Sequence, residues 1–427
     1  MSFFSKKKDT FCALPFSHLS ISPDGKQRIC CNNNTYPTFG PEKKLINVTD
    51  PDFNIRDAFN NPLHREIRTS MMRGEQHPTC FRCWEIENGG GESYRTSFNQ
   101  MLRKKVESEV LPDMKEDGTI ENPRFHYMEM TFGNKCNLRC RMCNPWSSVQ
   151  WLKEANQLGL WNVDKATLND LEKFNWFENE GAREFLKSSL EFVDRLNFLG
   201  GEPLLIKEHL ELLEECVRMG RANKIIIQYN TNLTYIPENI REIWRHFKLV
   251  DLNLSCDGFG DVNEYIRYPV KWDKWVENVR TISNWRSNVN LNLSFHCTFQ
   301  TLNMTRLTDF YDWVWNIGTE LNLPRVPFMI YVTQPDYLDP RHAPQHIKEQ
   351  VTAEHQKYFE KVEKQNLTFV EKMWLSMLKG HLNTFRNATE NSSEIWQKFI
   401  ANTKIIDTSR QQNILTVAPA FSEYFHP

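Results

Sequence analysis

The sequence lacks any long apolar run and any excess of charge of one sign. No stretch of its 427 residues approaches the ~18 apolar residues that a membrane-spanning helix needs, and the mean hydropathy is −0.59, so no membrane span is expected. The 52 Lys and Arg residues nearly balance 54 Asp and Glu residues, which leaves a formal charge of −2. This balance disfavours a partner that is recognised mainly through phosphate charge, such as a nucleic acid.

Targeting signals and repeats are also missing. The opening residues, MSFFSKKKDTF, contain no apolar core of the kind found in secretory signals, and no internal repeat or low-complexity segment appears. We therefore expect a cytosolic protein of two or three domains that folds without disulfides. In a reducing compartment, its 11 cysteines are expected to be metal ligands, catalytic thiols or buried apolar residues.

The middle of the chain alternates short apolar runs with amphipathic stretches, a pattern typical of βα units and a parallel sheet. The predicted strands are 126–132, 195–199, 224–229, 248–255, 291–299 and 326–333. The predicted helices between them include 181–194, 206–219, 272–286 and 304–317. Because six strands are too few for a closed eight-stranded barrel, we predict an α/β fold with an open, partial (β/α)6 barrel. Reactive groups in such sheets gather at the C-terminal ends of the strands.

The regions on either side of this middle part have a different pattern. The N-terminal region shows a predicted hairpin at 18–30 with its turn at Asp24-Gly25, a helical stretch near 53–73 and a glycine-rich loop at 89–91. The C-terminal region shows helical stretches at 346–364, 368–380 and 393–403, followed by a polar tail. The predicted domains are a small α+β unit at 1–124, the barrel at 125–340 and a helical segment at 341–427.

Three cysteines lie on one short loop directly after the first predicted barrel strand: Cys136, Cys140 and Cys143. Three soft thiolates so close together indicate a soft metal centre, either zinc or an iron–sulfur cluster. A four-iron cluster held by three cysteines keeps one iron open to a substrate or cofactor. A zinc site completed by a distant His or Cys is the alternative.

The second predicted barrel strand ends in Gly200-Gly201-Glu202-Pro203, at the same edge of the sheet. Two glycines allow the backbone to approach a ligand closely, and Glu202 offers an anionic acceptor for an amine. Taken alone, this tetrapeptide is equally explained as an ordinary turn. Its position beside the three-cysteine loop favours a shared site.

Together, Cys-x3-Cys-x-Met-Cys after the first strand and Gly-Gly-Glu-Pro after the second resemble the radical S-adenosylmethionine (radical SAM) superfamily over residues 125–335. The resemblance implies that the three cysteines hold a [4Fe-4S] cluster whose open iron chelates the methionine part of SAM. Reduction of that cluster would yield a 5′-deoxyadenosyl radical, which takes a hydrogen atom from a substrate. The SAM-binding residues implied are Met142, Gly200, Gly201, Glu202, Pro203, Asn230, Asn232, Ser255, Asp257 and Arg267.

For several of these residues an ordinary structural role is the alternative. Asn and Asp at strand ends are common turn residues, Met142 fits plain core packing, and Arg267 fits a surface charge. Cys256, also at a strand end, is a candidate hydrogen-atom donor to a substrate radical, with an inert buried thiol as the alternative. Arg139 and Arg141, which flank the three-cysteine loop, are expected on a solvated loop face.

A second group of cysteines precedes the predicted barrel. Cys12 and Cys30 bracket the predicted hairpin, and Cys80 and Cys83 form a Cys-x2-Cys pair, so four thiolates offer a complete set for zinc or an iron–sulfur cluster. The pattern resembles the SPASM/Twitch auxiliary-cluster module, in its single-cluster Twitch form, although that module usually follows the barrel. The resemblance implies a second [4Fe-4S] cluster at these four cysteines, with Cys31 as the alternative to Cys30.

The sequence as a whole predicts a radical SAM enzyme whose substrate is a peptide or protein residue, or else a small molecule such as a sugar or nucleoside. A flavodoxin- or ferredoxin-like protein would supply the electrons. Two alternatives belong to other classes: a non-catalytic scaffold stabilised by zinc, and an iron–sulfur electron-transfer protein without SAM chemistry.

Overall fold

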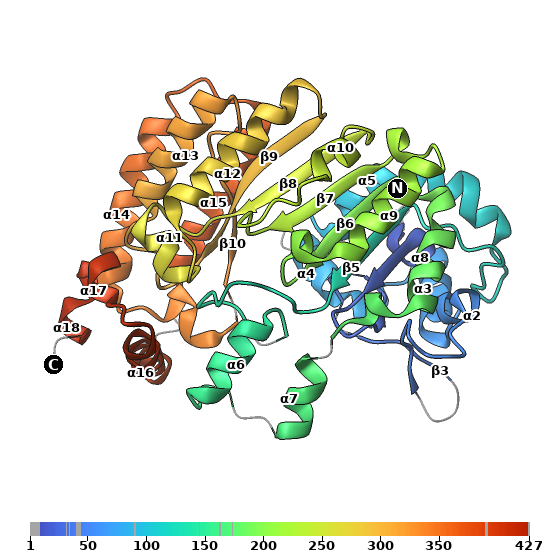
Figure 1. Ribbon diagram of the computed structural model, residues 1–427, viewed down its shortest axis with the longest axis horizontal. Coiled ribbons are helices and arrows are strands. Elements are labelled where there is room, and N and C mark those ends of the chain that lie inside the picture. The colour runs from blue at the N-terminus through green and yellow to red at the C-terminus, as the bar shows by residue number, and fades with distance from the viewer. Residues whose placement is uncertain are drawn as a thin grey trace, which may run out of the picture.

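The computed structural model describes residues 9–30, 32–33, 35–39, 44–88, 91–144, 146–161, 164–172, 174–332, 334–388 and 392–425. An eight-stranded sheet runs through this part of the chain, with the order β10-β9-β8-β7-β6-β5-β1-β2 (Figure 1). Six of its strands match the predicted runs and pair in parallel: β5 (Tyr127–Phe132), β6 (Arg195–Gly200), β7 (Ile226–Thr231), β8 (Leu249–Ser255), β9 (Leu291–Phe299) and β10 (Phe328–Tyr331). The predicted partial (β/α)6 barrel is confirmed.

The N-terminal hairpin extends this same sheet. Strands β1 (His18–Ile21) and β2 (Gln27–Arg28) are antiparallel, and Gly25 turns between them at a φ of +80°. Strand β1 also pairs in parallel with β5, with Ser20 opposite Glu129. The sequence pattern predicts a separate N-terminal unit, whereas the structure joins this region to the barrel through shared backbone hydrogen bonds. The domain boundaries after 124 and 340 stay predictions.

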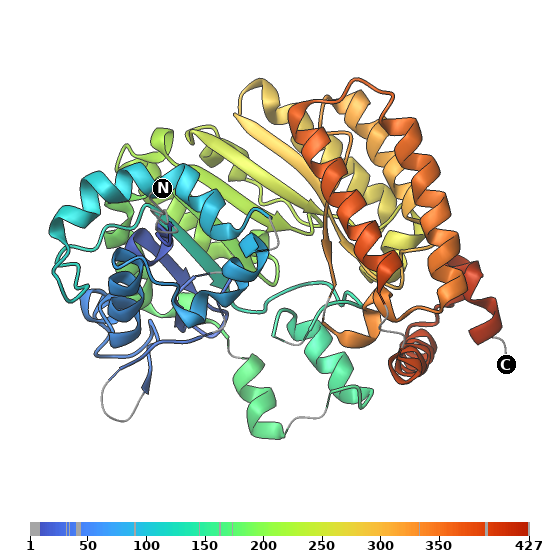
Figure 2. The same ribbon diagram turned by 180° about the vertical axis from the view of Figure 1, so that it is seen from behind.

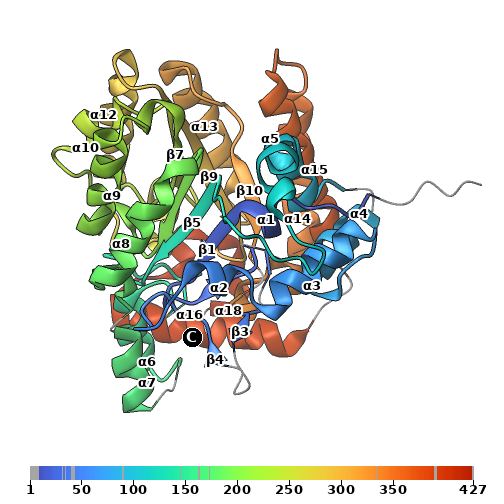
Figure 3. The ribbon, with the colours of Figure 1, turned by 90° about the vertical axis from the view of Figure 1, so that its right-hand side faces the viewer.

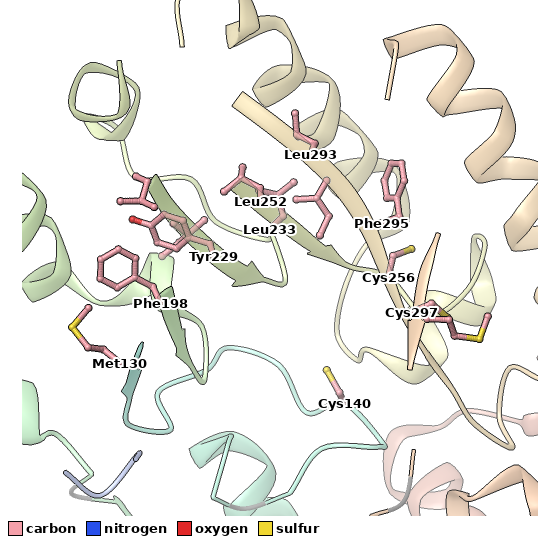
Figure 4. Close-up of a cluster of buried hydrophobic side chains, with 14 of the residues drawn as sticks. Met130, Cys140, Phe198, Tyr229, Leu233, Leu252, Cys256, Leu293, Phe295 and Cys297 are labelled. Atoms are coloured by element: carbon pink, nitrogen blue, oxygen red, sulfur yellow. The ribbon is translucent and has the colours of Figure 1, made fainter. Parts of the chain in front are cut away.

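The two faces of the barrel sheet differ in polarity. One face carries a row of buried apolar side chains on successive strands, shown in Figure 4: Met130, Phe198, Tyr229, Leu252 and Leu293. Each such side chain contributes on the order of 1.5–3 kcal/mol when fully buried. Helices follow the strands on this side: α8 (Glu180–Ser188), α9 (Lys207–Arg218), α10 (Ile240–Trp244), α11 (Asp261–Ile266), α12 (Trp272–Asn284) and α13 (Leu307–Leu321).

The opposite, concave face lies between N-terminal and C-terminal helices. Figure 3 shows α5 (Tyr94–Lys105) and α15 (Phe369–Asn387) on one side of the sheet, with α9, α10 and α12 on the other. Figure 2 shows that α5 and α15 stand at opposite ends of the sheet. Helix α15 begins with a reciprocal cap between Thr368 and Glu371, which satisfies donors in its first turn.

The remaining N-terminal elements and those after β5 are short: α1 (Leu14–Ser17), β3 (Thr38–Phe39), β4 (Lys44–Leu45), α2 (Ile55–Phe59), α3 (Pro62–Met72), α4 (Phe81–Asn88), α6 (Val149–Gln157) and α7 (Lys165–Glu172). The C-terminal region adds α14 (Gln345–Val362), α16 (Ser393–Arg410), α17 (Ile414–Val417) and α18 (Ser422–Phe425). The predicted polar tail is wrong, because Ile414, Val417 and Phe421 are buried in the core. Among the described helices, none is long and apolar enough to cross a membrane.

Candidate functional site

The three-cysteine loop follows β5 and is held in place by backbone hydrogen bonds. Arg139 N donates to Tyr268 O at 2.8 Å, Arg141 N donates to Ile266 O at 2.8 Å, and Cys143 N donates to Cys140 O at 3.0 Å. These contacts fix the loop against the end of α11. The loop therefore has one defined shape on which its three thiols are displayed.

Burial raises the pKa of all three thiols on this loop, including that of Cys143 to about 12. The guanidinium of Arg267 lowers the pKa of Cys140 and Cys143, against the effect of burial. The Sγ of Cys136 accepts bonds from Leu138 N at 3.4 Å and Asn232 Nδ2 at 3.7 Å. These hydrogen-bond donors and the nearby cation stabilise the deprotonated form of the thiols, which is the form that binds a soft metal centre.

The two glycines at the end of β6 allow close backbone packing, with Gly201 against the three-cysteine loop and Gly200 against β5, whereas the sequence pattern predicts a close approach to a ligand. A Cβ on Gly201 would lie 2.3 Å from the carbonyl oxygen of Lys135, and one on Gly200 would lie 2.6 Å from that of Phe132. Gly200 also has a φ of +135°. Both glycines are therefore required by the close approach of backbone to backbone.

We predict that Gly201→Ala displaces the three-cysteine loop, because its new methyl group would overlap the backbone of Lys135. The expected result is loss of iron from this loop while the N-terminal cysteine set keeps its iron. Iron and sulfide analysis of the purified variant measures this, with Gly380→Ala as the control at an exposed glycine of α15 that has nothing within 4 Å. Equal iron in both variants would contradict the prediction.

The carboxylate of Glu202 makes hydrogen bonds to other groups of the protein. Its carboxylate accepts bonds from Thr231 Oγ1 at 2.7 Å, Asn232 N at 2.6 Å and Leu204 N at 3.1 Å, and burial raises its pKa to about 7. With its side chain buried and three acceptor positions used, Glu202 ties the end of β6 to the end of β7. The predicted contact with an amine of SAM receives no direct support from this geometry.

Asn230, the penultimate residue of β7, and Asn232, just after the strand, face different parts of the site. Asn232 touches the cluster loop, where its Nδ2 also donates to Asn137 Oδ1 at 3.2 Å. Asn230 is exposed, lines the concave face and accepts a bond from Asn253 Nδ2 at 2.6 Å. Ser255 ends β8 beside His296 of β9 and is partly buried.

Asp257 and Arg267 form a buried ion pair. Arg267 Nε lies 2.7 Å from Asp257 Oδ2, and the other carboxylate oxygen accepts a bond from Thr298 N at 2.7 Å. Asp257 is fully buried, so the predicted ribose or carboxylate contact would require it to leave these partners. Arg267 instead lies close enough to Cys140 to affect its pKa. The pair thus places a positive charge behind the three-cysteine loop.

The other predicted SAM-site residues differ in exposure. Met142 is partly buried against the core, and Pro203 is buried at the start of a short 3-10 turn. Cys256 has no exposed surface, and its Sγ lies 3.3 Å from Gly258 O within the apolar cluster of Figure 4. A thiol enclosed in this way does not line the concave face, so its predicted role as hydrogen-atom donor receives no support.

Helix α16 clamps the three-cysteine loop from the C-terminal side. Arg141 is 1% exposed, pairs with Asp407 at 2.5 Å and lies 3.7 Å from the centre of the Tyr265 ring. Arg410 pairs with Glu154 at 2.7 Å and donates to Arg139 O at 2.7 Å. The predicted solvated face is therefore wrong for Arg141, which lies in a buried charge network.

The four N-terminal cysteines line a single cavity. Cys12 precedes α1, Cys30 follows the hairpin, and Cys80 and Cys83 come from the α4 region. Cys31 lies outside the described residues. Among the residues that are described, no three or more His, Cys, Asp or Glu side chains are grouped around the position of a single metal ion. The hairpin and the Cys-x2-Cys pair therefore bring the four thiols to the wall of one cavity. By donor type, these thiols fit a soft metal cluster.

A large cavity occupies the concave face of the barrel. Its volume is about 1220 Å³, and it reaches the ends of β5, β6 and β7 at Thr131, Gly200 and Asn230. The cysteine loop follows the first of these strands. Its polar lining comes from alternate strand positions, including Glu129, Asn197, Gln228, Asp251, Asn253, Ser294 and His296. No sequence motif marks these residues, and their only local signal is that polar side chains recur at every second strand position.

Two hydrogen-bonded groups organise this lining. Glu129 pairs with Arg28 at 3.2 Å and accepts a bond from Tyr127 OH at 3.2 Å. On β9, Ser294 Oγ lies 3.0 Å from His296 Nε2. Burial lowers the pKa of His296 to about 4, so its imidazole is neutral at neutral pH. The concave face is therefore polar and largely preorganised.

Comparison with known families assigns both cysteine regions. Residues 130–314 match the model of the radical SAM superfamily, and residues 12–84 match the model of an iron–sulfur cluster-binding domain, SPASM. The second match covers all four N-terminal cysteines and confirms that this module precedes the barrel.

Several known proteins are similar to parts of this chain. The GTP 3′,8-cyclase of Peptoclostridium acidaminophilum is 26% identical over 159 residues, which are 37% of this chain and 42% of that protein. Among solved structures, anSMEcpe with bound AdoMet is 17% identical (57% of this chain, 62% of that chain, TM-score 0.37). SuiB of Streptococcus suis bound to the precursor peptide SuiA is 14% identical (76% of this chain, 67% of that chain, TM-score 0.37).

Proposed function

This chain carries a radical SAM domain preceded by an iron–sulfur cluster-binding domain, and from that premise we propose that it abstracts hydrogen from a peptide or protein residue. The two domains imply a SAM-binding [4Fe-4S] cluster and a further iron–sulfur cluster. When bound and reduced by one electron, the first cluster and SAM supply methionine and a 5′-deoxyadenosyl radical, which becomes 5′-deoxyadenosine by taking a substrate hydrogen atom.

We assign the first cluster to Cys136, Cys140 and Cys143. Their loop is fixed by backbone bonds, receives the positive charge of Arg267 and is clamped by α16. Gly201 allows the end of β6 to pack on this loop, and Glu202 N donates to Lys135 O there at 2.9 Å. The chain's own residues thus hold the three-cysteine loop beside the ends of β5, β6 and β7, which also contribute to the lining of the concave cavity.

The observation that carries the proposal is that the strand ends beside this loop also line the concave cavity. A substrate in the cavity would lie against Thr131, Gly200 and Asn230, on the strand ends that lead into the cysteine loop or pack on it. Enclosure between the strands and the two flanking helices would shield a radical from water and other quenchers. The strand ends therefore bring substrate and radical source together.

The size and rim of the cavity favour a peptide over a small molecule. About 1220 Å³ exceeds the roughly 300–1,000 Å³ of small-molecule sites. Its rim carries exposed apolar side chains: Tyr94 is 53% exposed, Ile330 51% and Val370 40%, and the neighbouring Phe369 is 82% exposed. Apolar side chains around an opening are typical of surfaces that receive a macromolecule. The electron donor we propose is a flavodoxin- or ferredoxin-like protein.

The proposed reaction is tested by anaerobic incubation of reduced, cluster-replete full-length protein with SAM. We expect formation of 5′-deoxyadenosine and methionine in equal amounts, measured by liquid chromatography and mass spectrometry. Protein with a full complement of iron and sulfide that forms neither product would favour the electron-transfer alternative. Colourless protein with stoichiometric zinc would favour the scaffold alternative.

The N-terminal set gives a separate prediction. We expect the double variant Cys80→Ala/Cys83→Ala to lose about half of the cluster iron but to keep cleavage of SAM without substrate, because the three-cysteine loop lies elsewhere in the fold. Iron analysis and the 5′-deoxyadenosine assay measure the two effects. Cys216→Ala is the control, since Cys216 is a buried thiol of α9. Complete loss of cleavage in a folded double variant would contradict the separation of the two sites.

A further inference from the structure

A belt of polar side chains crosses the floor of the concave cavity. Strand register aligns five residues of neighbouring strands, and all of them line the cavity: Glu129, Asn197, Gln228, Asp251 and Asn292. Side chains that are paired across a parallel sheet point to the same face. The belt is therefore one continuous surface that a bound substrate meets.

The two carboxylates of this belt differ in whether they have a charged hydrogen-bond partner. Glu129 is neutralised by Arg28 at 3.2 Å. The carboxylate of Asp251 makes no hydrogen bond or ion pair with the residues that the structure describes. Burial raises the pKa of Asp251, and the charge of Arg195 offsets this only in part. The NH1 group of Arg195 donates to Gln228 Oε1 at 3.1 Å and not to Asp251. Asp251 is thus a half-buried carboxylate whose acceptor positions face the cavity.

A substrate that fills the cavity displaces the water that would otherwise solvate Asp251. A carboxylate that loses water without gaining a donor is strongly disfavoured, so the substrate itself has to supply that donor. A cationic group is the strongest donor for a carboxylate. The carboxylate of Asp251 on the cavity floor therefore favours a substrate with a positively charged group.

The same lining is unfavourable for phosphate. Among the described lining residues, the two arginines are already engaged: Arg28 pairs with Glu129, and Arg286 NH1 donates to Leu321 O at 2.6 Å. His296 is neutral at neutral pH. An anion beside Asp251 would be repelled by its carboxylate, and the nearby Arg195 already bonds to Gln228. A nucleoside triphosphate consequently fits this floor poorly.

We propose that Asp251 binds the cationic side chain of a lysine or arginine in the substrate peptide. Asn253, which bonds to Asn230 near the strand ends, lies two residues from Asp251, or about 7 Å along the strand. A long cationic side chain can reach Asp251 when its peptide backbone lies beside the amides of Asn230 and Asn253. The methylene groups of such a side chain also suit the apolar parts of the lining, such as Leu199 and Leu293.

This inference rests on the proposed function, and it is tested by binding alone. The probes are two pools of seven-residue peptides with acetylated N-termini, amidated C-termini and random flanking positions. One pool has lysine at its centre and the other has neutral Nε-acetyl-lysine. Equilibrium dialysis against cluster-replete full-length protein, followed by mass spectrometry, gives the fraction of each pool retained.

We expect the wild-type protein to retain the lysine pool roughly tenfold better, as one charge-assisted hydrogen bond implies. Asp251→Asn, which keeps the shape of the side chain, should remove this preference, and Asp251→Glu should restore part of it. Asp273→Asn, at an exposed position of α12, is the control and should bind as the wild type does. Thermal unfolding and iron content verify that each variant is folded.

Equal retention of both pools by the wild type, or an undiminished preference in folded Asp251→Asn, would overturn the inference. A failure of the proposed function can be distinguished from a failure of this inference. Wild-type protein that prefers the lysine pool but forms no 5′-deoxyadenosine would overturn the reaction and leave the recognition intact. Protein that cleaves SAM without preferring the lysine pool would overturn the recognition alone.

Discussion

Replacing Cys136, Cys140 and Cys143 together with alanine is expected to reduce formation of 5′-deoxyadenosine to background. The reason is that these thiols are the only protein ligands that we assign to the SAM-binding cluster. Cluster iron should fall to the amount that the N-terminal set holds. Product formation is measured by mass spectrometry, and iron and sulfide by chemical analysis.

The N-terminal set provides the internal control for this triple variant. Its four cysteines line a cavity of their own, formed by the hairpin and α4, so its iron and its optical absorption should remain. Cys297→Ala is a matched control, since Cys297 is a buried thiol in β9. Residual SAM cleavage in the triple variant, or loss of all iron, would show that the two cysteine groups are assigned wrongly.

Asp407→Ala is expected to destabilise the protein by about 3–5 kcal/mol, because it leaves the guanidinium of Arg141 buried without its charge partner. The same change removes the acceptor of Tyr265 OH at 2.7 Å and of Ile414 N at 2.7 Å. Since Arg141 lies between two of the cluster cysteines, the loop should also lose iron faster. Urea unfolding gives the free energy, and release of iron to a chelator gives the rate.

Two further variants separate the effect on the loop from a general loss of stability. Asp407→Asn keeps an acceptor for Arg141 and should be intermediate. Lys398→Ala, on the same helix, breaks an exposed pair with Asp336 and should change the free energy by less than about 1 kcal/mol. Release of iron from Asp407→Ala at the wild-type rate would contradict a clamping role for α16.

Local sequence patterns were sufficient to predict the barrel and the two cysteine sets. Strands β5 to β10 each coincide with an apolar run, and the spacing of Cys136, Cys140 and Cys143 is a short-range signal that needs no tertiary information. The hairpin was also visible, because Asp24-Gly25 is a strong turn signal. The patterns did not show that β1 would pair with β5, since that pairing joins segments about a hundred residues apart.

The rest of the site depends on contacts between distant segments. Arg141 looked solvated because its partner, Asp407, is 266 residues away and belongs to a helix with no distinguishing motif. Glu202 looked free to bind a ligand because its three donors come from the next strand and its own turn. Asp251 was overlooked because parallel strands are usually apolar on both faces, and a polar face appears only where a sheet borders a cavity.

The most direct test of the account is electron paramagnetic resonance of the reduced full-length protein with and without SAM. The account predicts two cluster signals, of which SAM shifts only the one that disappears in the variant lacking Cys136, Cys140 and Cys143. Reduced, cluster-replete protein whose spectrum is unchanged by SAM would contradict the central claim that this loop holds a cluster with an iron open to SAM.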